Sequence, residues 1–238
     1  MRLLAIETSG LRCGAAVIED GQLKAWLESE QGLTHSRRLM PLVQALLDSQ
    51  GLKAKDMDLL ALSVGPGSFT GLRIGAATCQ GIAAASGARV IEVPTLASLA
   101  APWQPLGLPV LSLIDARHAR CYAALYEDFG VGLPESAIEP GVYSLEEIGQ
   151  LLTQRAHETI ILTGDGQHYA TEGGYAPRLA AGRTLRLSAV TQSSAVDVAR
   201  LAWSAWLADP ALALDAANVR PQYLNRTAAE KNLGIEVD

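Results

Sequence analysis

The chain has 238 residues, 49% hydrophobic and 18% charged, enough to bury a sizeable core in one large domain or in two lobes. Its 19 basic and 25 acidic residues give a formal net charge of −6, which argues against a broad basic surface for nucleic acid. Cys13, Cys79 and Cys121 form no C-x-x-C pair, which argues against a zinc or disulfide framework. Without a signal-peptide core or an apolar run of roughly 20 residues, we expect a cytoplasmic protein with no membrane contact.

The spacing of apolar residues in the first hundred positions predicts alternating strands and helices. In chain order we expect strands over 3–7, 13–18 and 22–28, a helix around 39–47, a strand over 59–64, a helix from about 71 to 86, a strand over 89–93 and a short helix over 95–101. The first three strands form a meander. The strand that ends in Gly65 and the helix after it form a crossover unit.

Three prolines, Pro102, Pro105 and Pro109, indicate a linker. We therefore divide the chain into an N-terminal lobe over residues 1–104 and a C-terminal lobe over 105–238. In the second lobe we expect a helix that Ser144 and Glu147 cap, a strand over 160–163, a helix over 193–207 and a mobile tail over 225–238.

The second lobe begins with a repeat of the first. Residues 114–128 align with residues 6–20 without a gap, and seven of these fifteen positions are identical. Two lobes that each open with this hairpin predict an α/β fold of the actin, sugar-kinase and Hsp70 type (ASKHA), with two duplicated lobes, each a mixed β-sheet flanked by helices. Such a fold does not by itself define a function.

The two hairpin turns are candidate phosphate sites, because strand-end carboxylates suit a magnesium-bound phosphate and small residues let it approach the backbone. The candidate nucleotide- or anion-binding residues are Glu7, Thr8, Ser9, Gly10, Asp115 and Arg117. The second turn, Ala116-Arg117-His118, would place bulky side chains where a working kinase of this fold leaves space for the phosphate. Arg117 fits either an anion contact or a solvated turn.

The glycine loop from Gly65 to Gly71 has two interpretations. It is not a P-loop, because it lacks the Gly-Lys-Ser/Thr ending, but glycines before a helix can bind an anion. They can equally form a tight turn that seats the helix. From Gly71 to Gly87 every fourth residue is small. This row has two interpretations as well, because it could pack on the chain's own sheet or on a partner helix.

The inventory of catalytic groups is poor. His35, His118, His157 and His168 are isolated in the sequence, and none belongs to a metal-binding pair. We therefore expect no metal site, no catalytic residue and no tightly bound cofactor, although ATP or ADP could occupy the cleft or a complex interface.

Three segments together resemble the TsaB family: Leu4 to Ser9, Thr34 to Pro41, and above all Gly65-Pro66-Gly67-Ser68-Phe69-Thr70-Gly71-Leu72-Arg73-Ile74-Gly75. The resemblance implies a part in adding a threonylcarbamoyl group to the adenosine beside the anticodon of tRNAs that read codons starting with A. It implies a non-catalytic partner of the transferase TsaD, whose H-x-x-x-H metal site corresponds here to Thr95 and Leu99.

The resemblance also implies partners. These are the TsaD transferase, bound through the first two helices of the N-terminal lobe, and the ATPase TsaE, with tRNA reached only through the complex and a homodimer in isolation. The interface residues that we predict are Leu39, Leu42, Val43, Leu72, Arg73, Ala76, Ala77 and Gln80.

Two other functions stay open at the level of sequence. One is an ATP-dependent phosphotransferase or weak ATPase of the same fold that uses Glu7, Thr8, Ser9 and Asp115. The other is a peptidase, against which the lack of paired metal ligands and of a nucleophile-base set counts.

Overall fold

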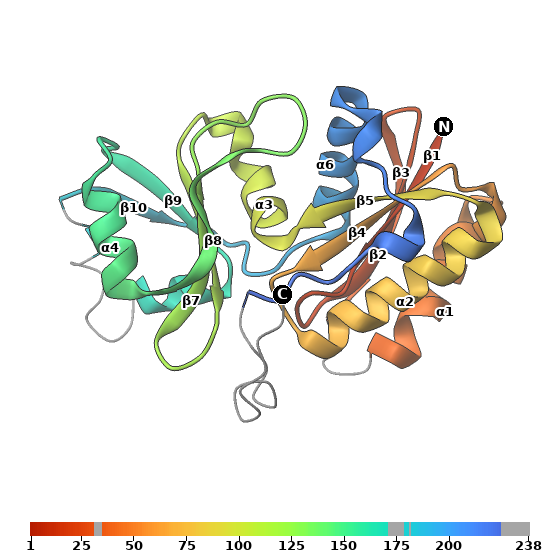
Figure 1. The fold of residues 1–238 in the computed structure, drawn as a ribbon, viewed down its shortest axis with the longest axis horizontal. Helices are drawn as coiled ribbons and strands as arrows, with labels where there is room; N and C mark the ends of the chain where they lie inside the picture. The colour runs from red at the N-terminus through yellow and green to blue at the C-terminus, as the bar shows by residue number, and fades with distance from the viewer. Residues whose placement is uncertain (31–34, 171–178, 181, 225–238) are drawn as a thin grey trace.

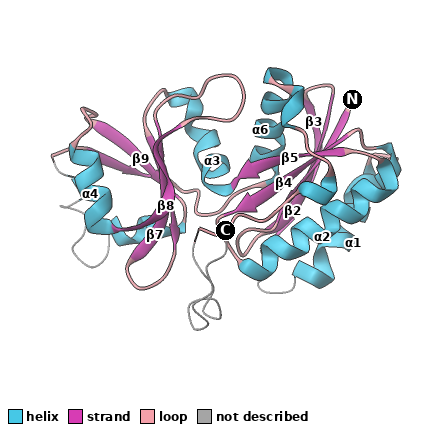
Figure 2. Ribbon diagram, in the orientation of Figure 1, coloured by secondary structure: helices cyan, strands magenta, loops and turns pink. Residues whose placement is uncertain are grey.

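The computed structural model describes residues 1–30, 35–170, 179–180 and 182–224. It contains two mixed sheets of five strands each, with helices on their faces (Figures 1 and 2). The predicted tail over 225–238 and Thr34 lie outside the described residues. No helix in the described ranges is long and apolar enough to cross a membrane.

The first sheet has the strand order β3-β2-β1-β4-β5. Its strands are β1 (Arg2–Glu7), β2 (Cys13–Glu19), β3 (Gln22–Ser29), β4 (Leu59–Gly65) and β5 (Arg89–Pro94). β1 and β4 run parallel in the middle of the sheet and, apart from Arg2, are buried throughout, because helices cover both faces there. β3 is an edge strand, and its residues alternate toward solvent.

The second sheet repeats this order, as β8-β7-β6-β9-β10. Its strands are β6 (Val110–Asp115), β7 (Arg120–Tyr126), β8 (Ser136–Ser144), β9 (Thr159–Thr163) and β10 (Thr184–Leu187). In both sheets the first strand pairs with an antiparallel hairpin partner on one side and with a parallel strand on the other. This shared topology confirms the predicted ASKHA fold with two duplicated lobes.

Five α-helices of the described chain cover these sheets: α1 (His35–Ser49), α2 (Phe69–Ser86), α3 (Thr95–Ala100), α4 (Leu145–Thr153) and α6 (Ala195–Ala208). α1 and α2 lie on one face of the first sheet, α4 lies on the outer face of the second, and α3 lies between the two sheets (Figure 1). Short 3-10 helices lie at Ala54–Asp56, Ala101–Leu106, Asp165–Ala170, Pro210–Leu212 and Ala216–Asn218. The predicted Ser144 cap is present, since Ser144 Oγ accepts from Glu147 N.

α6 follows the second sheet in sequence but packs on the first. Its small buried residues, such as Ala195, Ala199 and Ala202, lie against β1 and β2 in a core that also contains residues of the second sheet. The chain then runs along the first sheet, where Leu214 pairs with Val90 and Gln222 N donates to Val64 O. A boundary at residues 104/105 therefore separates the strands of the two sheets, while the segment from α6 to residue 224 belongs with the first.

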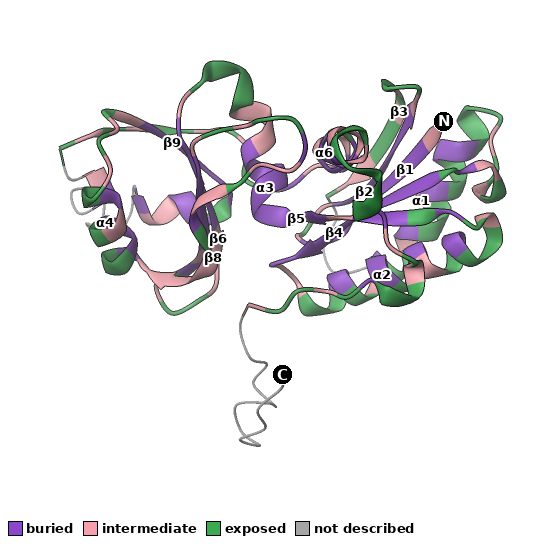
Figure 3. Cartoon of the chain, turned by 45° about the horizontal axis from the view of Figure 1, so that its top comes forward, coloured by how far each residue is buried: buried purple, intermediate pink, exposed green. Residues whose placement is uncertain are grey.

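The duplicated hairpins differ in register by one residue. Glu7 pairs with Gly14, whereas Asp115 pairs with Cys121, so the second turn is one residue shorter than the gap-free alignment implies. A one-residue shift turns every side chain of a strand to the opposite face. Accordingly, Ile6 packs toward α1 and α2, whereas Ile114 packs toward the core between the sheets. The buried residues lie mainly in the strands and on the helix faces that pack against them (Figure 3).

Candidate functional site

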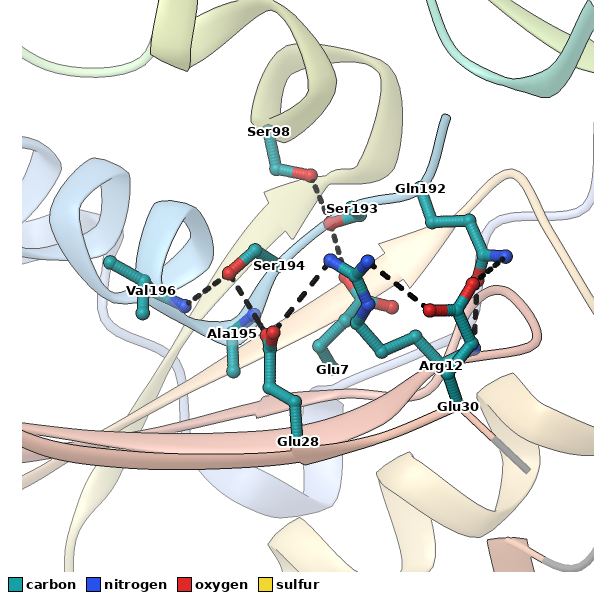
Figure 4. Close-up of polar contacts among 10 residues, drawn as sticks. All are labelled: Glu7, Arg12, Glu28, Glu30, Ser98, Gln192, Ser193, Ser194, Ala195 and Val196. Atoms are coloured by element: carbon teal, nitrogen blue, oxygen red, sulfur yellow. Dashed lines mark hydrogen bonds and ion pairs between the residues drawn. The ribbon is translucent and has the colours of Figure 1, made fainter. Parts of the chain in front are cut away.

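Glu7 ends β1 and is almost fully buried, with 1% of its surface exposed. One carboxylate oxygen accepts from Ser9 N at 2.5 Å, and the other accepts from Ser193 Oγ at 2.5 Å (Figure 4). Ser193 Oγ also lies 2.5 Å from Ser98 Oγ in α3. The predicted phosphate-site carboxylate is thus engaged by the turn that leads into α6.

This arrangement predicts a structural role for Glu7. Replacing Glu7 with Ala leaves Ser193 Oγ and Ser9 N without their acceptor in a buried place, so we expect the free energy of unfolding to fall by about 2–4 kcal/mol. Urea denaturation monitored by circular dichroism measures this change. An unchanged denaturation midpoint, combined with a loss of ATP hydrolysis, would instead mark Glu7 as a ligand of substrate.

Thr8 and Ser9 form the turn after β1, and the glycine loop packs directly on them. Ser68 N donates to Ser9 O at 2.6 Å, and Ser68 Oγ caps α2 by accepting from Gly71 N at 3.2 Å. A Cβ atom on Gly67 would lie 2.3 Å from Ser9 O, so only glycine allows this approach. The loop is filled by the chain's own backbone, which favours its structural interpretation over an anion site.

Asp115 and Arg117 lie in the second hairpin turn and do not converge with Glu7. Because of the shifted register, Asp115 faces the opposite side of its sheet, where it accepts from Tyr169 OH at 3.1 Å and from Arg117 N at 2.7 Å. Arg117 has a φ of +69° and an 84% exposed side chain. The structure therefore brings together Glu7, Thr8, Ser9 and Gly10, but keeps Asp115 and Arg117 apart from them.

A small pocket lies between the lobes. Its lining includes Ser9, Gly10, Thr95, Asp165 and Ser193, but neither Glu7 nor Asp115. Its volume is about 40 Å³. Sites for small molecules and cofactors usually measure roughly 300–1,000 Å³. The pocket is therefore much smaller than a typical cofactor site.

Thr95 and Leu99 occupy the positions where the resemblance places the two histidines of a metal site. Both are buried, and Thr95 Oγ1 lies 2.9 Å from Ser63 Oγ. Neither side chain is a metal ligand of the nitrogen or thiolate type that zinc prefers. Across the described residues no group of three or more His, Cys, Asp or Glu side chains could hold a metal ion.

A polar network holds the turn before α6 against the first hairpin. Arg12 lies 3.7 Å from Glu28 and 3.6 Å from Glu30, and Arg12 N donates to Gln192 Oε1 at 2.8 Å (Figure 4). Glu28 Oε1 accepts from Ala195 N at the start of α6 at 2.8 Å, where a carboxylate is favourable. Sequence reasoning missed this network, because its members are up to 180 residues apart and follow no local motif.

Asp197 lies in the first turn of α6, beside this network. Burial, opposed mainly by Arg200, raises the pKa of its carboxyl group to about 6 from the usual 3.8. Between these two values the folded state holds a proton that the unfolded state has released, so stability falls as the pH rises from about 4 to about 6. We expect Asp197→Asn to stabilise the chain by about 1–3 kcal/mol at pH 7.5 and by little at pH 4. Urea denaturation at both pH values tests this, and an equal effect at both would contradict it.

The predicted interface residues fall into two groups. Leu39 and Val43 of α1 and Leu72 and Ala76 of α2 are buried, with between 1% and 6% of their surface exposed. The row of small residues beginning with Gly71 and Gly75 also faces the chain's own sheet. Of the eight residues, Arg73 and Ala77 are exposed, and Leu42 and Gln80 are partly exposed. A partner in contact with α2 would therefore meet Arg73, Ala77 and Gln80 rather than the buried row.

The outward side of α2 borders two shallow pockets that the segment after α6 completes. One of about 340 Å³ is lined by Arg73, Ala76, Ala77 and Gln80 together with residues of the segment 219–223. The other, of about 540 Å³, extends from Gln80 past the end of α2 to Arg89 at the start of β5 and is bounded by residues 215–217. The two pockets share Gln80, and together we call them the groove along α2. Four of the predicted interface residues line the smaller pocket.

Comparison with known proteins identifies the family. The sequence matches the family model described as TsaD, tRNA N6-adenosine threonylcarbamoyltransferase, over residues 30–205. It is 31% identical, over 98% of both chains, to the tRNA threonylcarbamoyladenosine biosynthesis protein TsaB of Escherichia coli (strain K12).

Two solved structures from Pseudomonas aeruginosa are similar over 94% of this chain. One, described as an uncharacterized protein with similarity to peptidase YEAZ, superposes with a TM-score of 0.81 at 29% identity over 94% of this chain and 99% of that one. The other, YeaZ, superposes with a TM-score of 0.77 at 28% identity and the same coverage. The chain belongs to the TsaB (YeaZ) family.

Proposed function

We propose that this chain takes part in the biosynthesis of threonylcarbamoyladenosine in tRNA, as a non-catalytic component that binds the TsaD transferase. The part in the pathway is supported by its relative from Escherichia coli, which is named for this biosynthesis. The binding role is supported by the groove along α2, which the described residues leave open beside exposed Arg73 and Ala77.

The main support for a non-catalytic role is the environment of the Glu7 carboxylate. A working kinase of this fold needs strand-end carboxylates that face a phosphate, but the Glu7 carboxylate is buried and bonded to Ser9 N and Ser193 Oγ. Asp115 faces the other side of its own sheet, and the pocket between the lobes measures about 40 Å³. Glu7 and Asp115 therefore do not form the converging acidic pair that would position a nucleotide in such a kinase.

The test is reconstitution of tRNA threonylcarbamoylation from the purified transferase and the ATPase TsaE, with and without this chain. We expect modified tRNA only when the chain is present, and no ATP hydrolysis by the chain alone. The variant Asp115→Asn should support modification as well as the wild type does. Robust ATP hydrolysis by the isolated chain, lost in Asp115→Asn, would make the chain an ATPase and overturn the proposal.

A further inference from the structure

The 340 Å³ pocket beside α2 contains an ordered arginine. The Arg73 guanidinium lies 3.9 Å from the centre of the Phe69 ring, and Arg73 Nε donates to Tyr223 OH at 3.2 Å. The rings of Phe69 and Tyr223 are 5.0 Å apart. These contacts hold Arg73 in one orientation at the pocket wall, so that little side-chain entropy remains to be lost when it binds.

A second arginine lines the same pocket. Arg220 Nη1 donates to the carbonyl oxygens of Ala217 and Val219, at 2.6 and 2.9 Å, which orders its guanidinium as well. Within the described residues, neither Arg73 nor Arg220 has a carboxylate within 4.0 Å of its guanidinium. The Glu92 carboxylate accepts from the backbone N of Arg220 at 2.9 Å, not from its guanidinium. Among the described residues, two ordered guanidinium groups without a paired carboxylate therefore share one pocket, in a chain of net charge −6.

Most of the remaining lining of the pocket is apolar. Ala76, Ala77, Val219 and Pro221 line it together with the polar side chain of Gln80 and with Tyr223. An occupant that matches both features carries an acidic group on an apolar surface. Guanidinium groups bind carboxylates with two parallel hydrogen bonds, which gives such a contact direction as well as strength.

We infer that this pocket receives an acidic side chain, Asp or Glu, from the partner protein that covers α2. The inference rests on the proposed function, which makes that partner the transferase. RNA fits the pocket less well: Arg73 lies over the Phe69 ring that a base would stack on, and the net charge of −6 opposes a phosphate backbone. The two arginines thus determine which protein surface can dock on α2.

The first test measures the dissociation constant of the complex between full-length chain and transferase at several salt concentrations. We expect Arg73→Gln and Arg220→Gln each to weaken binding about tenfold at low salt and to reduce its salt dependence. Arg186→Gln removes the same charge from an exposed site on β10 and should leave binding unchanged. Wild-type affinity and salt dependence in both pocket variants would overturn the inference while leaving the proposed function intact.

The second test identifies the partner group directly. In the Arg73→Lys variant, a zero-length carbodiimide reagent should join the new lysine to an Asp or Glu of the transferase, which mass spectrometry of the cross-linked peptides would locate. Background is low, since the chain's lysines are Lys24, Lys53, Lys55 and Lys231. Arg186→Lys serves as the control and should give no such product.

Other results of these tests would point to a different occupant of the pocket. Cross-links only to a second copy of this chain, or weaker tRNA binding with unchanged transferase binding, would each contradict the inference. A wild-type chain that does not bind the transferase at all would overturn the proposed function and the inference together.

Discussion

Replacing Gly71 with Ala is expected to lower the free energy of unfolding by about 2–4 kcal/mol, one of the largest effects of any small substitution in this chain. A Cβ atom at this position would lie 2.1 Å from Thr8 O, and that oxygen belongs to the backbone of the turn after β1. Neither α2 nor β1 can withdraw without disturbing the core between them. The gain in helix propensity from Gly to Ala, about 1 kcal/mol, is too small to compensate.

Gly81, in the same helix, provides the matched control. No described atom lies within 4 Å of the place where its Cβ would stand. We therefore expect Gly81→Ala to stabilise the chain by about 0.5–1 kcal/mol, because alanine loses less backbone entropy than glycine in a helix. Urea denaturation of both variants at equal protein concentration measures the two effects. Equal shifts of the same sign would show that the small residues of α2 do not pack closely on the first sheet.

The second large effect concerns the complex. Ala77 lies on the outward side of α2, in the pocket that Arg73 and Gln80 also line. We expect Ala77→Glu to weaken binding of the transferase by about 100-fold, because it places a bulky charge in the interface and next to Arg73, four residues earlier on the helix. Isothermal titration calorimetry with the purified transferase measures the dissociation constant, and tRNA modification in the reconstituted system should fall with it.

The folding of the Ala77→Glu variant should be unaffected, since surface substitutions usually change stability by less than about 0.5 kcal/mol. Ala156→Glu makes the same change at an exposed position of the second lobe and should leave transferase binding unchanged. If Ala77→Glu bound the transferase as tightly as the wild type, α2 would not be the docking surface.

Much of the local structure could be predicted from the sequence. Apolar runs such as Leu3 to Ile6 and Leu59 to Val64 became buried central strands, and Ser144 with Glu147 marked the start of α4. The repeat of residues 6–20 at 114–128 predicted two lobes of equal topology, which the matching strand orders confirm. These features depend on side-chain periodicity and on local hydrogen bonds, which neighbouring residues determine.

The candidate site was less predictable, because its character depends on which face of a strand a residue occupies. Glu7 and Asp115 end equivalent strands, yet a second turn that is one residue shorter directs them to opposite sides of their sheets. The gap-free match of the two sequences hid this difference. A register is decided by how the whole sheet pairs and packs, so a local comparison does not reveal it.

By itself, then, the sequence determined the order of strands and helices, the duplication and the family resemblance carried by Gly65 to Gly75. Only the tertiary structure decided that α6 returns to the first sheet, that Ser193 reaches the Glu7 carboxylate, and that residues 219–223 complete a groove along α2. The physical reason is distance along the chain. Periodicity shows that a helix has an apolar face, but the surface that this face covers is chosen by packing among segments up to 180 residues apart.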